Sequence, residues 1–405
     1  MSVAYSLPHT GLSMAGVVET LRGVLCPASS EPVPRVILST IVFERKETLD
    51  QGQLAELSLA TLHSLRTGTP FAGRCRITAS DMRHELDALP ANSLLLDISG
   101  EDRDLSQLQT LADQHTHLHF SFSTSPAPFL SDNCDDVLRV GESMKAELVA
   151  GIPLGGRYCR ANAMAVTVTE PQLSRNDEIG LASCAAVHRL GCPAPIIISL
   201  PLSPSPCLRL IHSAASLLLA AGADMSRVIF SNLVVTDRNA SRLADLMRTH
   251  RFFVSIDCMG VSAVSLPTEG ESFPSDSDIV AGIELLCSQG LSAQLIVSVY
   301  ARSKLFLRKF GGPGYDWLEE SVVPRLRGSP TASAYVSNLF GANAMKQLGG
   351  RIPEVFEEIP PETLPCYVCG KTFVPGDHFT KFDFVYCSSA CLNSHRRRNW
   401  ATESR

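Results

Sequence analysis

The sequence has no long uninterrupted stretch of apolar residues. Its best run, Ala214 to Ala223, falls short of the roughly 20 residues that a membrane-spanning helix needs. The first residues, MSVAYSLPHTGLSMAG, also lack the pattern of a secretory signal, which is a cationic start, an apolar run and a cleavage site. We therefore expect no membrane attachment and a cytoplasmic location, with the nucleus as the alternative.

Charge of one sign is not in excess either. The 405 residues carry 35 Lys and Arg against 41 Asp and Glu, which gives a net charge of −6. This balance excludes a protein that coats nucleic acid over its whole surface. No glycine-rich dinucleotide motif follows a predicted strand and no P-loop occurs, so nucleotide chemistry has no support. The apolar share of 45% is enough for a large core and excludes wholesale disorder.

What the sequence does contain is a repeated alternation of short aliphatic runs and helical stretches between residues 36 and 350. Several of the runs are apolar on both faces, which is typical of parallel strands covered by helices. Eight such runs predict an α/β fold, a (β/α)8 TIM barrel. The predicted strands are 36–43, 93–99, 117–123, 160–168, 195–200, 227–233, 252–257 and 293–300.

After residue 350 the composition changes. We predict a barrel over 1–350, an acidic, proline-rich linker over 351–364, and a small cysteine-bearing domain over 365–405. Thirteen cysteines in a chain of this size without a secretory signal are expected to be reduced. Four of them fall in the small domain with the spacing C-x2-C-x17-C-x3-C, namely Cys366, Cys369, Cys387 and Cys391.

The paired spacing of these four cysteines predicts one structural zinc ion in a closed tetrahedral site. His395 or His378 could replace one of the cysteines as a ligand. The pattern resembles a treble-clef zinc finger, and about 40 residues have too little core to fold without the metal. Arg396, Arg397 and Arg398 follow, either as a basic edge for nucleic acid or as a solvated helix end.

Several segments of the predicted barrel resemble the phosphotriesterase family of the amidohydrolase superfamily. The most specific is SKLFLRKFGGPGYDWLEESVVPRLR over 303–327, which is similar to the end of that family's barrel. The segment 225–247 looks like its sixth strand and helix, and VVETLRGVLCP followed by VILSTIVF looks like its amino-terminal hairpin and first strand. The resemblance implies a barrel whose mouth holds two divalent metals that activate a bridging water.

Carried over position by position, the family's ligands fall on residues that suit metals poorly. The HxH pair falls on Thr40 and Val42, the bridging ligand on Ala165, and the histidines of strands five and six on Ser199 and Asn232. The aspartate of strand eight falls on Tyr300. Because Val and Ala offer no lone pair and the other side chains are neutral and weak toward zinc, we expect no barrel metals.

Three functional hypotheses follow. The first is a catalytically inactive barrel that acts as a binding or scaffold protein, with the zinc finger contacting a protein partner. The second keeps a hydrolase of ester, lactone or phosphotriester bonds with remodelled ligands, which would need His115, His117 or His119 to face the mouth from one strand. The third is a nucleic-acid-binding finger that uses Arg396, Arg397 and Arg398.

Overall fold

The computed structural model describes residues 18–25, 34–39, 77–100, 103–130, 136–264, 272–301 and 303–349, with short pieces between 364 and 394. The chain divides into two compact units, Met1–Ile352 and Pro353–Arg405. The predicted linker 351–364 lies outside the described residues except for its last position, so its limits stay a prediction. Within the ranges given above, no helix combines the length and apolar character needed to cross a bilayer.

The first unit is built around eight parallel strands, each within or close to a range predicted from the sequence. Their hydrogen-bonded order is β12-β11-β10-β9-β8-β5-β4-β3, and every neighbouring pair is parallel. The strands are β3 (Val36–Ser39), β4 (Leu94–Asp97), β5 (His119–Thr124), β8 (Ala163–Thr167), β9 (Ile196–Ser199), β10 (Val228–Ser231), β11 (Phe253–Met259) and β12 (Leu295–Val299). The expected (β/α)8 barrel is confirmed.

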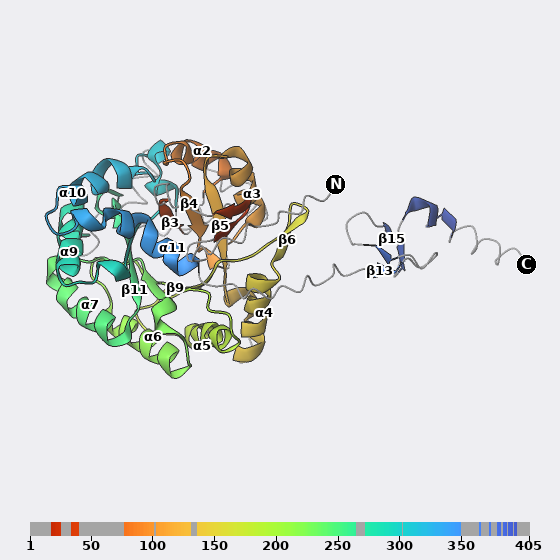
Figure 1. Ribbon diagram of the computed structural model, residues 1–405, viewed down its shortest axis with the longest axis horizontal. Coiled ribbons are helices and arrows are strands. Elements are labelled where there is room, and N and C mark those ends of the chain that lie inside the picture. Colours follow the sequence, from red (N-terminus) through yellow and green to blue (C-terminus); the bar gives the residue numbers. More distant parts are fainter. Residues whose placement is uncertain are drawn as a thin grey trace, which may run out of the picture. The chain divides into compact units, whose positions relative to one another are not determined.

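Helices follow the strands and form a ring around them (Figure 1). Three of the helices begin at a capping box in which Ser or Thr and an Asp three residues later bond each other's backbone amides: Thr78 and Asp81, Ser174 and Asp177, Ser275 and Asp278. The ring contains α2 (Ala79–Asp87), α3 (Leu105–Gln114), α4 (Val137–Val149), α5 (Arg175–Arg189), α6 (Leu208–Ala220), α7 (Asp237–His250), α9 (Asp276–Ser288) and α10 (Val323–Arg327).

Shorter elements connect and close the ring. They are α8 (Val261–Val264), α11 (Asn343–Leu348), the π-helical turns η9 (Leu318–Val322) and η11 (Asn338–Ala342), and the 3-10 turns η4 (Ala127–Phe129), η5 (Met225–Arg227), η6 (Ser292–Gln294), η7 (Lys304–Phe306), η8 (Arg308–Phe310) and η10 (Ser333–Tyr335). Two hairpins complete the unit: β1 (Val18–Thr20) with β2 (Gly23–Leu25), and β6 (Ile152–Leu154) with β7 (Arg157–Cys159).

Side chains alternate along each strand between two separate cores. Every second residue of a strand, such as Ile198 on β9 or Phe230 on β10, packs outward under the helices. The next one, such as Ile197 or Ile229, packs inside the barrel in a second cluster. This period of two explains why the strands read as continuous apolar runs in the sequence.

The amino end of the barrel is closed by segments from both ends of the first unit. Val18 and Leu25 of the β1–β2 hairpin and Ala344, Met345 and Leu348 of α11 belong to the inner cluster. That cluster also contains Val36, Leu94 and Ala163, which lie at or near the first positions of their strands. The hairpin is fixed further by the amide of Leu21, which donates to the Phe120 carbonyl at 2.8 Å.

The seam between the first and last barrel strands is bridged by a side chain. Ser298 of β12 accepts the amide of Leu38 on β3 at 3.0 Å and donates to the carbonyl of the same residue at 3.1 Å. In the described part of the chain, β12 and β3 are the two ends of the hydrogen-bonded strand order. One buried hydroxyl therefore satisfies both backbone groups of a residue at the seam.

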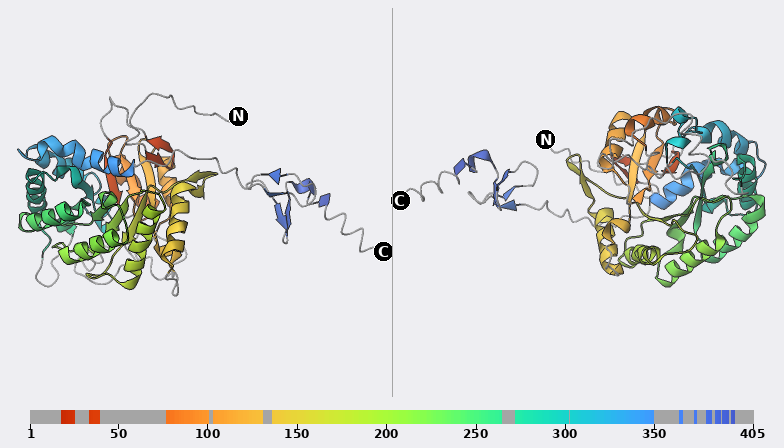
Figure 2. Two further views of the ribbon diagram at one scale, coloured as in Figure 1. Left: turned by 60° about the horizontal axis from the view of Figure 1, so that its bottom comes forward. Right: turned by 180° about the vertical axis from the view of Figure 1, so that it is seen from behind.

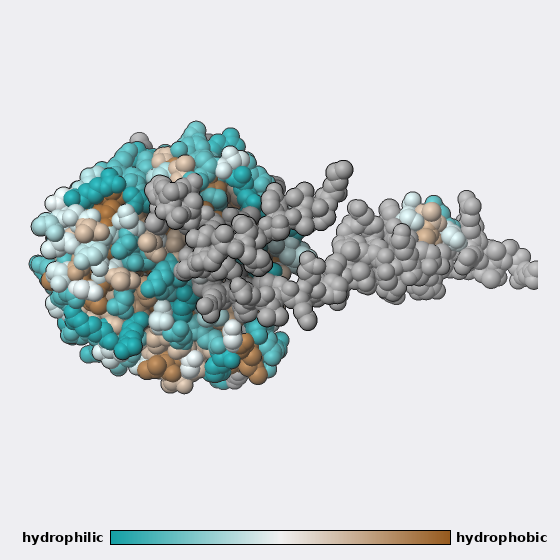
Figure 3. Space-filling model, in the orientation of Figure 1, coloured by the Kyte–Doolittle hydropathy of each residue, from teal (hydrophilic) through white to brown (hydrophobic). Residues whose placement is uncertain are grey.

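The outer surface of the barrel is mixed in character. On the face seen in Figure 3, hydrophilic residues predominate and hydrophobic ones are scattered. The exposed large apolar side chains in the described ranges are Leu138, Tyr158 and Leu219. Tyr158 belongs to the β6–β7 hairpin, which projects from the ring of helices (Figures 1 and 2). Scattered apolar residues of this kind are normal on a folded domain.

The second unit contains two short antiparallel pairs. β13 (Leu364–Pro365) pairs with β14 (Thr372–Phe373), and β15 (Phe379–Lys381) pairs with β16 (Phe384–Tyr386). Helical backbone follows over 389–391 and 393–394.

Candidate functional site

The carboxyl ends of the strands form the mouth of the barrel, which is where (β/α)8 proteins carry their sites. Four of the six positions predicted from the sequence are described, and all four lie on strands β8 to β12 or directly after them: Ala165, Ser199, Asn232 and Tyr300. The other two, Thr40 and Val42, follow β3 but lie outside the described residues.

A row of serines lines the inside of the barrel near this end. Backbone pairing sets Ser199 of β9 opposite Ser231 of β10, and the β10–β11 register continues the row to Ser255. All three side chains are buried. The sequence signal for this row is a serine that ends or interrupts each aliphatic run, as in PIIIS, VIFS and FVS. The sequence singles out Ser199 alone of the three, because each serine taken by itself is an ordinary strand residue.

Asp257, two residues beyond Ser255 on β11, is the charged group of this layer. Its Oδ2 accepts the hydroxyl of Ser231 at 2.6 Å and the amide of Asn232 at 2.8 Å, and its Oδ1 accepts the hydroxyl of Ser255. The side chain is 2% exposed. Burial raises the pKa of the Asp257 carboxyl, although the three hydrogen bonds oppose this shift.

Asn232 has a left-handed backbone, with φ of 64°. Asn tolerates this region better than most residues other than glycine. The turn aims the backbone amide of Asn232 at Asp257, while its side-chain amide donates to the carbonyl of Leu200 at 3.1 Å. Asn232 thus ties β10 to the strands on both sides, and its side chain is already engaged in hydrogen bonding.

The remaining mouth positions are less polar in their surroundings. Ala165 packs in the inner apolar cluster. The hydroxyl of Ser199 is buried and has no hydrogen-bond partner among the described residues. The Tyr300 ring is half-buried and meets Phe306 edge-on, with ring centroids 5.0 Å apart. The four positions therefore share one end of the barrel, but they do not converge on a single point through hydrogen bonds that the described residues show.

The histidine series of 115, 117 and 119 does not form the strand face that alternation predicts. His115 ends helix α3, His117 lies in the following turn, and β5 begins only at His119. All three lie at the amino end of β5, opposite the mouth. His115 is buried and its Nδ1 is 3.1 Å from the carboxylate of Asp87. The predicted strand limit was wrong here because the chain needs a turn between α3 and β5.

Cys258, next to Asp257, is fully buried. Burial and the adjacent carboxylate raise the pKa of this thiol well above its usual range. A thiol that keeps its proton is a poor nucleophile, so Cys258 is a core residue.

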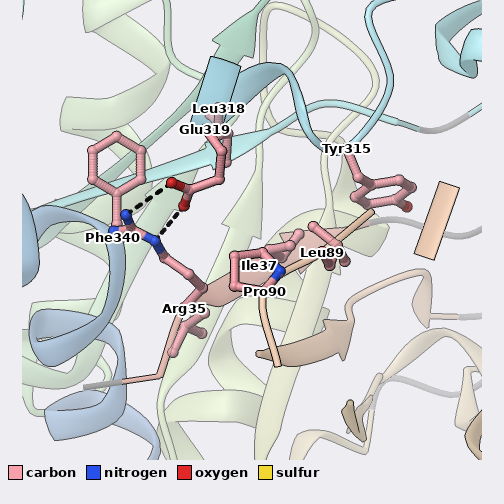
Figure 4. A pocket seen from close by; sticks show the side chains of 9 residues that line it. Arg35, Ile37, Leu89, Pro90, Tyr315, Leu318, Glu319 and Phe340 are labelled. Atoms are coloured by element: carbon pink, nitrogen blue, oxygen red, sulfur yellow. Dashed lines mark hydrogen bonds and ion pairs between the residues drawn. The ribbon is translucent and has the colours of Figure 1, made fainter. Parts of the chain in front are cut away.

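A narrow crevice lies at the opposite, amino end of β3 (Figure 4). Arg35 crosses it, paired with Glu319 through Nε to Oε1 at 2.5 Å and Nη2 to Oε2 at 3.2 Å, and its guanidinium lies 4.8 Å from the Phe340 ring centre. The crevice has room for about one water molecule. It joins the two π-helical turns η9 and η11 to β3 and is too small for a substrate.

In the second unit, Cys391 is the one predicted zinc ligand within the described residues. It is half-buried in the helical backbone of 389–391, and its amide donates to the Ser388 hydroxyl at 3.3 Å. Cys366, Cys369 and Cys387 lie outside the described residues, as do His378, His395 and the three arginines from Arg396 to Arg398.

Comparison with known families assigns both units. A model of the phosphotriesterase family matches residues 127–348, which is more than half of the chain. A second model, described as the Vms1-associating treble clef domain, matches residues 362–403.

Among individual proteins, an N-acetyltaurine hydrolase from Tetraodon nigroviridis is 27% identical over 147 residues, or 36% of this chain and 40% of that protein. A phosphotriesterase-related protein from Nematostella vectensis is 29% identical over 146 residues, again 36% and 40%. The matches thus span about two fifths of the curated relatives' length.

Two solved structures show the same fold. A resiniferatoxin-binding protein from Rhodobacter sphaeroides has a TM-score of 0.66 and 18% identity, covering 82% of this chain and 95% of that one. The lactonase Lmo2620 from Listeria monocytogenes has a TM-score of 0.60 and 15% identity, covering 82% and 98%.

Proposed function

This chain belongs to the phosphotriesterase family, and we propose that its barrel has lost the metal-dependent hydrolysis for which the family's mouth is built. The barrel then serves as a binding or scaffold domain. The carboxyl-terminal treble clef, held by one structural zinc ion, supplies contact with a protein partner.

The observation that carries the proposal is the internal bonding of the mouth. The side-chain amide of Asn232 donates a hydrogen bond to the Leu200 carbonyl. The carboxylate of Asp257 accepts three hydrogen bonds, from the hydroxyls of Ser231 and Ser255 and from the backbone amide of Asn232. The side chain of Ala165 is a methyl group and has no atom that could bind a metal. Two divalent ions need several anionic or imidazole ligands directed at one point, and these residues do not provide such a set.

The treble clef is proposed to bind its zinc through Cys366, Cys369, Cys387 and Cys391. The description of the matching domain names association with another protein, which supports a protein partner for this unit. The basic residues Arg396, Arg397 and Arg398 keep nucleic acid as a separate hypothesis. Alanine at all three positions would then weaken nucleic-acid binding and flatten its salt dependence.

Metal content tests the proposal directly. We expect about one zinc per full-length chain and none in a chain that ends at Gly350, because the four cysteines follow that residue and a weak chelator removes ions held by fewer side chains. Elemental analysis of both proteins after dialysis against a weak chelator gives the answer. Two or more metals retained by the shorter chain would overturn the inactive barrel.

A hydrolase is the second candidate, because relatives and neighbours carry hydrolase names. N-acetyltaurine and a simple lactone are the substrates to assay, with added Zn²⁺ or Mn²⁺. We expect no turnover above that of an Asp257→Asn variant. Turnover that needs added metal and is lost in this variant would establish the hydrolase instead.

A further inference from the structure

Two imidazoles face each other on the outer wall of the barrel. His212 lies on α6 and His250 is the last residue of the neighbouring helix α7. The Nδ1 of His212 is 3.3 Å from the Nε2 of His250, and the ring centroids are 5.3 Å apart. His212 is exposed and His250 is half-buried, so solvent reaches the pair. Nothing in the proposed function uses these residues.

The separation of the two nitrogens suits a shared metal ion. Zinc–imidazole bonds are about 2.0–2.1 Å long. Two nitrogens 3.3 Å apart then subtend about 105° at one ion, which is close to the tetrahedral angle. The same distance also permits a hydrogen bond between the rings, so the experiment must separate these two uses of the pair.

The ring of His250 is held in position before any ion arrives. It stacks on Phe252 at 6.4 Å with an interplanar angle of 19°. Phe252 is fully buried and meets Phe230 edge-on at 4.8 Å, which anchors the stack in the core. Less conformational freedom is lost when a ligand is already oriented, so this support favours binding.

The position of His250 at the end of helix α7 affects its surroundings and its protonation. Helix α7 ends there, with Arg251 in the left-handed conformation, so the partial negative charge of the last carbonyl groups is close by. Burial and the neighbouring His212 lower the pKa of His250, which favours the neutral form of its imidazole. A neutral imidazole has the free lone pair that metal coordination requires.

From this geometry we propose that His212 and His250 together bind one divalent metal ion of the class that prefers imidazole, such as Zn²⁺ or Ni²⁺. Within the described ranges no group of three or more His, Cys, Asp and Glu side chains is arranged to hold a metal, so the site has two protein ligands. Its other positions are left to water or to a side chain of a bound partner. The site lies on the α6–α7 surface and is independent of the inactive mouth and of the treble clef.

The test uses zinc-replete full-length protein without a histidine tag, titrated with Ni²⁺ in a calorimeter at pH 7. Four proteins are compared: wild type, His212→Ala, His250→Ala and the control His84→Ala. His84 is also an exposed histidine, on α2. Any Ni²⁺ bound by the cysteines of the treble clef is bound by all four proteins. A difference in Ni²⁺ affinity between them is therefore due to the two histidines. We expect the association constant to fall about tenfold or more in both pair variants and to stay unchanged in the control.

A second readout follows from linkage. An ion that binds only the folded state raises the melting temperature, so Ni²⁺ should raise it in wild type and His84→Ala but not in the pair variants. His250→Ala also removes the ring stacked on Phe252 and could lower stability for that reason. If the two pair variants give different results, His212→Ala decides, because His212 is exposed. Wild-type affinity for Ni²⁺ in His212→Ala would mean that the pair is a hydrogen bond alone, and would overturn the proposal.

Discussion

Asp257 is a carboxylate buried inside the barrel. A carboxylate removed from water is costly unless it is neutralised or fully bonded, and here two serine hydroxyls and one backbone amide surround it. The raised pKa means that the folded state holds the proton of Asp257 to a higher pH than the unfolded chain does. The free energy of unfolding therefore falls as the pH rises through the window above the ordinary carboxyl pKa of 3.8.

We predict that Asp257→Asn makes this fall in the free energy of unfolding smaller as the pH rises above the ordinary carboxyl pKa of 3.8. Asn has nearly the same shape and does not titrate, but its NH2 group donates where a carboxylate oxygen accepts, so we expect a loss of stability that is the same at every pH beside the change in pH dependence. Each unit of pKa difference corresponds to about 1.4 kcal/mol. Urea unfolding at several pH values measures the effect. Asp278 at the start of α9 has a pKa lowered from 3.8, so it adds stability that is lost as the pH falls below that value. Asp278→Asn should therefore make the free energy of unfolding rise less with pH in that acidic range. Parallel pH profiles for wild type and Asp257→Asn would contradict this account.

At this scale the sequence is only partly informative. It singles out Ser199 and Asn232 as mouth positions. It does not reveal that Asn232 turns left-handed or that Ser231 and Ser255 donate to the same carboxylate, because those bonds depend on the register between strands. Register is a property of the assembled sheet and cannot be read from one strand at a time.

Among the secondary-structure elements, the seam between β3 and β12 depends on Ser298. Loss of its hydroxyl would leave the buried amide and carbonyl of Leu38 without their partner. An unsatisfied buried backbone group costs about 1–3 kcal/mol.

We therefore predict that Ser298→Ala lowers the free energy of unfolding by about 1–3 kcal/mol. Ser213→Ala on the exposed face of α6 is the matched control and should change it by less than about 0.5 kcal/mol. Chemical denaturation of the three proteins at pH 7 is the measurement. Equal midpoints for wild type and Ser298→Ala would mean that water or nearby chain replaces the hydroxyl.

The eight strands follow well from the sequence because each is a short apolar run, and α5 and α9 also have the capping residues that mark a helix start. Three kinds of element do not follow. The turn at His117 interrupts a convincing alternation, and the β6–β7 hairpin adds strands outside the barrel. The π-helical turns η9 and η11 flank Arg35. They provide the Glu319 and Phe340 that contact this arginine, and these contacts join segments that are far apart in the chain.

For the whole molecule, the two compact units imply two largely independent folding events. The first has an extensive apolar core. The described residues of the second form two short strand pairs and a few helical positions, so its stability is expected to come from zinc.

We predict that Cys391→Ser reduces zinc to well below one per chain and makes the treble clef sensitive to protease, while the melting temperature of the barrel stays unchanged. Cys207→Ser is the control, because this half-buried cysteine lies on the barrel and outside the predicted ligand set. Elemental analysis, limited proteolysis and a thermal melt answer the three parts. A full complement of zinc in Cys391→Ser would point to His395 or His378 as the fourth ligand.

The closure of the amino end has a consequence during synthesis on the ribosome. The inner cluster is completed by the β1–β2 hairpin, which is made first, and by α11, which emerges only after all eight strands. Until Met345 and Leu348 leave the exit tunnel, the apolar side chains around Val36 and Leu94 lack part of their cover. The nascent barrel should therefore attract chaperones that bind apolar surface up to that moment, and lose them within the short interval before the zinc module emerges.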